Sequence, residues 1–205
     1  YVTAYQEIKK GAIGEPVHIF IRRNNVLASA QRLRKHSSVL FFLGIHDIDF
    51  VNWCMGVKPE TVYGVAVSKV LGDTPDTVLA LMTFPDGTIA SLEASWVLPE
   101  SLPGTLDARF DVVGTNGALY VDGGAGAVSI ASERFTQPGI SYAPDLFGES
   151  VGILRDELAH LDSCAAEGIP PIVTGEDGKR AVEVASAIQE SLDSGRVVRV
   201  ASGGA

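Results

Sequence analysis

The segment DTVLALMTFPDGTIASLEASWVL, residues 76–98, has the pattern of two β-strands joined by a tight turn. Asp86 and Gly87 lie between the two apolar runs and predict a two-residue hairpin, because both residue types tolerate the positive φ that such turns require. In the second run every other residue is apolar, which predicts a strand with one buried face. That face carries Ala90, Leu92, Ala94, Trp96 and Leu98. Because a hairpin joins antiparallel neighbours, the segment predicts an antiparallel sheet.

The two-residue period continues on both sides of this hairpin, and a helical period flanks it. We predict strands at residues 15–24, 60–70, 106–114, 118–123, 126–132 and 196–200, with a second hairpin turn at Asn116-Gly117. We predict helices at residues 1–10, 37–56, 154–167 and 174–194, and loops at 25–37 and 136–148. Thr174 and Asp177 have the spacing of a capping box. The order of elements predicts an α+β fold, a largely antiparallel, open-faced sheet with helices packed on one face.

One face of this sheet should lack a cover. Both sides of the strand at residues 60–70 are apolar, and the run VLALMTF at residues 78–84 has no polar side. The few predicted helices cannot cover both faces of such a sheet. Because a large exposed apolar face usually marks an interface, we expect a homo-oligomer, a dimer or tetramer, through the open face.

The composition is that of a folded domain and argues against several classes of function. Of the 205 residues, 46% are hydrophobic and 20% are charged, and the formal net charge is −9. We expect no nucleic-acid partner, because the nearest approach to a basic patch is the short run RLRKH at residues 32–36. We expect no membrane partner, because no apolar run reaches the roughly 20 residues of a membrane span. Cys54 and Cys164 form no C-x-x-C pair, and two buried thiols favour a reducing compartment, so we expect a cytoplasmic protein.

The segment SSVLFFLGIHDIDFVNWCMG, residues 37–56, concentrates polar residues in an otherwise apolar helix. A catalytic cluster, a metal site and an ordinary amphipathic helix all remain open. The imidazole of His46 titrates near neutral pH and can take and return a proton. Asp49 lies one turn later on the same helical face, whereas we expect Asp47 to be an exposed charge near the helix start. Two ligands on one face are too few for a metal site, so we expect no metal.

Several motifs together resemble one known family, the C-terminal domain of the Gfo/Idh/MocA oxidoreductases. The motifs are GAIGEPV (11–17), GIHDIDFVNWCMG (44–56), FPDGTIASLEASW (84–96), DVVGTNGALYVD (111–122) and TGEDGKRAVEVASAIQESLDSGRVVRV (174–200). The resemblance implies that residues 1–200 form a substrate and oligomerisation domain, and we expect residues 201–205 to be a disordered tail. It also implies an N-terminal Rossmann domain that binds NAD or NADP and lies outside this chain. The glycines of DGGAGA, residues 122–127, lead into a strand rather than a helix, so we expect no cofactor-binding residues here.

The resemblance also implies roles for particular side chains. His46 corresponds to a histidine that handles the hydroxyl proton, and family dehydrogenases often pair it with an aspartate four residues earlier. Phe42 stands there in this chain, so another carboxylate must take its place or the chemistry differs. Asp49 is the candidate catalytic partner, and a carboxylate from a missing loop is the alternative. Substrate contacts are implied for three arginines, at the first strand end and in the following loop: Arg22, Arg23 and Arg34.

The implied function is an NAD(P)-dependent oxidoreductase acting on a hydroxyl of a sugar, inositol or related polyol, with this chain alone inactive. The alternative is a non-catalytic oligomerisation and small-ligand-binding module. The feature that favours this alternative is Phe42, because a phenyl ring can neither orient an imidazole nor raise its basicity.

Overall fold

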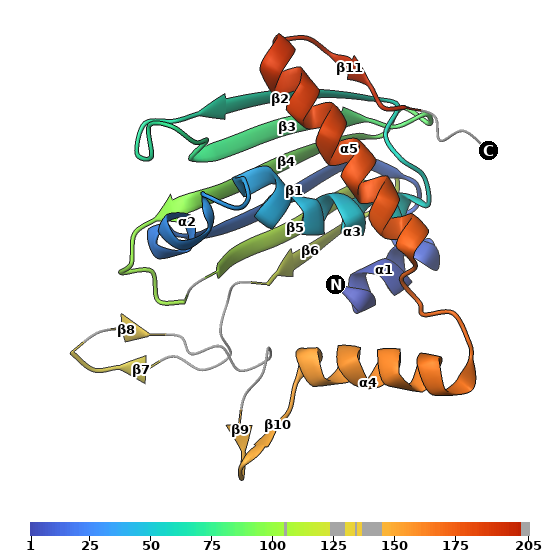
Figure 1. The fold of residues 1–205 in the computed structure, drawn as a ribbon. Helices are drawn as coiled ribbons and strands as arrows, with labels where there is room; N and C mark the ends of the chain where they lie inside the picture. Colours follow the sequence, from blue (N-terminus) through green and yellow to red (C-terminus); the bar gives the residue numbers. More distant parts are fainter. Residues whose placement is uncertain (105, 124–129, 134, 137–144, 202–205) are drawn as a thin grey trace.

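The computed structural model describes residues 1–104, 106–123, 130–133, 135–136 and 145–201. Its centre is a seven-stranded sheet with the strand order β11-β2-β3-β4-β1-β5-β6 (Figure 1). The strands are β1 (Pro16–Val26), β2 (Thr61–Val67), β3 (Thr77–Thr83), β4 (Ile89–Leu98), β5 (Leu106–Gly114), β6 (Ala118–Asp122) and β11 (Val198–Arg199). Two short ribbons lie outside the sheet, β7 (Ile130–Ala131) with β8 (Phe135–Thr136) and β9 (Asp145–Leu146) with β10 (Glu149–Ser150).

The sheet pairs its strands antiparallel except at its centre, where β1 runs parallel to β4. The two predicted pairs of neighbouring antiparallel strands are confirmed, but the turns differ from those expected. Gly87 has a φ of +90°, whereas Asp86, Asn116 and Gly117 do not have a positive φ. The inner face of β4 is buried from Ala90 to Trp96, as the alternating pattern predicts. The expected tail at 201–205 and the strand at 126–132 lie mostly outside the described residues, as does most of the loop at 136–148.

Helices cover one face of the sheet, which confirms the predicted fold class. They are α1 (Val2–Lys9), α2 (Leu27–Leu33), the π-helical turn η1 (Leu40–Gly44), α3 (Ile45–Met55) and α5 (Gly175–Ser194). Figure 1 shows α5 running obliquely across this face with α3 beside it. The helix α4 (Ile153–Glu167) is the exception, because it lies away from the sheet. Its apolar side chains stay exposed, with Leu158 at 59%.

The expectation of a loop at residues 25–37 is wrong. The strand β1 continues to Val26, and α2 follows directly. Its sequence LASAQRL consists mostly of good helix formers. Ala30 is fully buried, and the carboxylate of Glu100 accepts a hydrogen bond from the backbone N–H of Ala28 at 2.7 Å. A distant side chain therefore satisfies a donor of the first turn that a helix leaves unpaired.

Asp76 organises the loop between β2 and β3. Its carboxylate is buried and accepts hydrogen bonds from the backbone N–H groups of Lys69, Val70 at 2.7 Å and Leu71 at 2.8 Å. Burial raises the pKa of this carboxyl, but the three backbone hydrogen bonds act in the opposite direction, and the pKa is lowered overall. The charged form is therefore the one that the loop stabilises.

We expect Asp76→Ala to lower the free energy of unfolding at pH 7 by about 3 kcal/mol, because three backbone N–H groups lose their acceptor. Asp76→Asn keeps one acceptor oxygen and should lose less. The folded-state pKa lies below the unfolded one, so the contribution of the charge is present above the unfolded pKa. It is lost as the pH falls through the folded pKa. Urea denaturation should show the deficit of the alanine variant shrinking toward acid pH; a deficit that grows there would contradict this account.

Candidate functional site

A cavity of about 330 Å³ lies between α3, the start of α5 and the chain that leads into α5. The inner face of α3 contributes His46, Asp49, Phe50 and Trp53, which recur at helical spacing. The remaining lining residues come from the N-terminus, β1, the end of α3 and the beginning of α5: Tyr1, Arg23, Asn52, Gly56, Val57, Ile172, Val173, Asp177 and Arg180. Sequence segments far apart therefore meet around the predicted histidine.

His46 lies at the beginning of α3, directly after the π-helical turn η1, and its side chain keeps an exposed surface. Single π-helical turns are rare and occur often at functional sites. Burial lowers the pKa of His46, and the positive charge of Arg23 lowers it further, while Asp49 and Glu157 act in the opposite direction. At neutral pH the imidazole is thus mainly neutral, which is the form that can accept a proton.

Asp49 lines the same cavity as His46, so the structure brings the two predicted catalytic residues together. Burial raises the pKa of the Asp49 carboxyl, repulsion by Asp177 raises it further, and the positive form of His46 lowers it. Phe42 lies elsewhere. It packs against Trp96 with ring centroids 6.5 Å apart and belongs to the hydrophobic core.

Arg23 lines the cavity and forms a close ion pair with Asp47. Its Nε and Nη2 atoms both donate to Asp47 Oδ1, at 2.9 and 2.7 Å. The expectation that Asp47 is an exposed helix charge is wrong, because its side chain is 0% exposed. The helix-covered face of β1 presents Arg23 to α3, and this cation makes burial of the carboxylate possible. Burial nevertheless raises the pKa of Asp47 to about 6, against the opposing effect of Arg23.

The other two predicted arginines do not line this cavity. Arg22 follows the alternation of β1 to the opposite face of the sheet and donates to Asp107 at 2.8 Å. Arg34 follows α2 and pairs with Asp73 at 2.7 Å. Contact of Arg22 and Arg34 with substrate stays a prediction.

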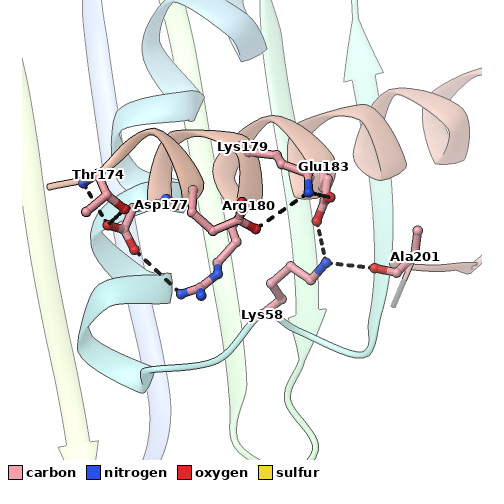
Figure 2. Close-up of polar contacts among 8 residues, drawn as sticks. Lys58, Thr174, Asp177, Lys179, Arg180, Glu183 and Ala201 are labelled. Carbon is pink, nitrogen blue, oxygen red and sulfur yellow. Dashed lines mark hydrogen bonds and ion pairs between the residues drawn. The ribbon is translucent and has the colours of Figure 1, made fainter. Parts of the chain in front are cut away.

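Two cavity residues, Asp177 and Arg180, were missed as site residues in the sequence. The predicted capping box is confirmed: the N–H of Asp177 donates to the Thr174 hydroxyl at 3.3 Å, and the N–H of Thr174 donates to the Asp177 carboxylate at 2.8 Å. Hydrogen bonds from Thr174 lower the pKa of Asp177. Figure 2 shows Arg180 reaching back to this carboxylate, 3.5 Å away. Their role depends on the first turn of α5 lying close to α3, and the sequence does not reveal this placement.

A polar contact also ties α3 to α5. Lys58, in the loop after α3, pairs with Glu183 of α5 and donates to the backbone carbonyl of Ala201 at 2.7 Å (Figure 2). This ion pair lowers the pKa of Glu183. The contact fixes the two helices that form opposite walls of the cavity.

Residues 1–104, 106–123, 130–133, 135–136 and 145–201 contain no group of three or more His, Cys, Asp or Glu placed to hold a metal ion. Of the helices in the described part of the chain, none has the length and apolar character needed to cross a membrane.

The comparisons with known proteins agree with the fold. The family described as the GFO/IDH/MocA C-terminal domain matches residues 1–120. The chain therefore belongs to the Gfo/Idh/MocA family, and the resemblance seen in the sequence is confirmed.

Several inositol dehydrogenases are similar to this chain. The chain is 28% identical over 211 residues to scyllo-inositol 2-dehydrogenase (NAD(+)) of Bacillus subtilis, covering 98% of this chain and 59% of that protein. It is 24% identical over 201 residues to myo-inositol 2-dehydrogenase of Thermotoga maritima, covering 95% of this chain and 59% of that protein. The crystal structure of myo-inositol 2-dehydrogenase from Lactobacillus plantarum has the same fold, with a TM-score of 0.79 at 22% identity over 98% of this chain and 61% of that chain. The chain thus spans about three fifths of the length of these relatives.

Proposed function

We propose that the full-length protein is an NAD- or NADP-dependent oxidoreductase that oxidises a hydroxyl of a sugar, inositol or related polyol. The observation that carries the proposal is that His46 and Asp49 line one cavity of about 330 Å³, within a family whose relatives include inositol dehydrogenases. In this proposal residues 1–200 form the substrate and oligomerisation domain.

The chemistry assigned to this chain is the proton half of the reaction. Oxidation of an alcohol removes a proton from oxygen and a hydride from carbon. His46 takes the hydroxyl proton as general base, and Asp49 stabilises the imidazolium that forms. Arg23 lies in the same cavity within reach of a bound hydroxyl compound, so its substrate contact remains part of the proposal.

The described residues do not fit the cofactor. They include no strand, glycine turn and helix in succession of the kind that holds a dinucleotide phosphate, and residues 124–127 of the glycine run lie outside them. We therefore assign NAD or NADP to the part of the protein beyond this chain and route no step through it.

The test is turnover by the full-length protein. It is incubated with NAD⁺ or NADP⁺ and, in turn, myo-inositol, scyllo-inositol and glucose, and formation of the reduced cofactor is followed by absorbance. Turnover with any of these supports the oxidoreductase. Polyol binding in calorimetry without turnover supports the alternative, a non-catalytic binding and oligomerisation module, which is favoured by the packing of Phe42 into the core. If the protein shows neither polyol binding nor turnover, this result contradicts both the oxidoreductase and the binding module.

We also propose a homo-oligomer through the open face of the sheet. This face exposes apolar side chains from β2 to β6: Tyr63, Val65, Val67, Leu79, Leu81, Ile89, Val113 and Tyr120. Between β2 and β4 it is hollowed by a depression of about 400 Å³. An exposed apolar surface of this extent is unusual for a monomer.

We expect Leu81→Asp to dissociate this oligomer, because the change places a charge in the middle of the sheet face that the oligomer would bury. Leu81 and Leu158 are both 59% exposed, but Leu158 lies on α4, away from the sheet. Leu158→Asp is therefore the matched control, and sedimentation velocity is the measurement. Equal sedimentation of the parent and the Leu81 variant would contradict the proposed interface.

The compartment follows the same proposal. Cys54 and Cys164 are free and buried. Free thiols are typical of reducing compartments, so we propose a cytoplasmic location.

A further inference from the structure

Two consecutive arginines of β1 make the same kind of contact on opposite faces of the sheet. Arg22 pairs with Asp107 at 2.8 Å on the open face, and Arg23 pairs with Asp47 at 2.7 Å on the helix-covered face. Only the second pair lies beside the cavity that contains His46. The two pairs thus differ in whether they lie beside the cavity that contains the imidazole of His46.

We propose that the Arg23–Asp47 ion pair is a positioning unit for His46. It holds a permanent positive charge at a fixed place beside the imidazole and so keeps this ring neutral and ready to accept a proton. The inference deepens the proposed function and rests on it, because a neutral imidazole matters only if His46 acts as the base.

The geometry fixes the guanidinium from two sides. Asp47 Oδ1 accepts two of its N–H groups, and the face of the Tyr1 ring lies 5.8 Å from its central carbon. Asp47 itself is fully buried in α3, next to His46 in the sequence. The second carboxylate oxygen, Oδ2, is buried without a hydrogen-bond partner within the described part of the chain. A guanidinium held in this way keeps its charge at every physiological pH.

Other charges face His46 and act in both directions. Asp49 on the same helix and Glu157 on α4 favour the protonated imidazole. Asp177 and Arg180, on the first turn of α5, line the cavity opposite and are paired with each other. Burial is the largest cause that lowers the pKa of His46 and the charge of Arg23 is the second, while the two carboxylates oppose both. Without Arg23, the imidazole would be surrounded mainly by negative charge.

The test measures the protonation of His46 directly, in the full-length protein labelled with ¹³C-histidine. The NMR signal of His46 is the one lost in His46→Gln. We expect Arg23→Gln to raise the titration midpoint of His46 by roughly half a pH unit or more, because the carboxylates near the imidazole remain and favour its protonated form. Asp47→Asn should lower the midpoint, since the charge of Arg23 is no longer balanced. Arg23→Lys retains the charge and should leave the midpoint close to that of the parent.

The matched controls are Arg22→Gln and Asp107→Asn, which break the equivalent ion pair on the open face. Neither should move the midpoint of His46. If Arg23→Gln does not fold, Asp47→Asn decides alone, because only a unit that acts through charge predicts a lower midpoint. A midpoint that stays fixed in both variants, or moves in the same direction in both, overturns the inference.

The outcome separates this inference from the proposed function. Responsive midpoints together with full turnover in His46→Gln would uphold the charge relation and overturn the role of His46 as base. Turnover that depends on His46, with a midpoint that ignores Arg23 and Asp47, would overturn only the positioning unit.

Discussion

In the full-length protein, His46→Ala is expected to lower kcat/KM by about 100- to 10,000-fold, the usual contribution of a general base. The physical reason is that the hydroxyl proton then has no neutral acceptor in the cavity. Steady-state kinetics with the polyol that gives turnover is the measurement.

A second histidine supplies the control for this variant. His36 is exposed in the turn after α2 and does not line the cavity. His36→Ala should keep kcat/KM within a factor of two or so, as expected for a surface change away from the site. If His46→Ala retained the turnover of His36→Ala, His46 would not be the base, and the binding module would be the better interpretation.

The largest loss of stability is expected for Phe110→Ala, about 3–5 kcal/mol in the free energy of unfolding. Phe110 of β5 is fully buried and meets the ring of Phe50 edge-on, with centroids 4.8 Å apart. Phe50 belongs to α3 and to the wall of the cavity. The substitution would thus leave a void directly beneath the helix that carries His46.

Chemical denaturation measures this loss, and Phe147→Ala is the control. Phe147 is 99% exposed, so its truncation should change the free energy of unfolding by less than about 0.5 kcal/mol. Similar losses in the two variants would show that β5 and α3 are not held together by the aromatic contact.

The local parts of the fold could be predicted from the sequence. Alternation and turn residues gave β2 to β6 and both hairpins, since each depends on neighbouring residues. The parallel pairing of β1 with β4 could not be predicted, because no local signal links Ile19 to Ala90. The helix α2 was missed because its first turn is stabilised by Glu100, which is distant in the sequence.

The same limit applies to the site. His46 and Asp49 could be selected together because helical spacing brings them to one face. The burial of Asp47 depends on Arg23 of another element, and the contribution of Asp177 and Arg180 depends on where α5 begins relative to α3. These placements follow from tertiary packing, which residue patterns do not encode. The same holds for Arg22 and Arg23. Alternation along β1 places them on opposite faces of the sheet, and the folded sheet turns Arg23 toward the cavity and Arg22 away from it.

The position of β1 inside the sheet, between β4 and β5, affects how the chain folds. Ile19 is flanked by Ala90 of β4 and Val112 of β5, both of which follow it at a long distance along the chain. Among the strands of this sheet β1 is synthesised first, and it gains both neighbours only after two large loops have closed, which makes folding slow. Until then the edges of an apolar strand are open to pairing with other chains. Rapid capture of β1 by a chaperone during translation would therefore protect the nascent protein from aggregation.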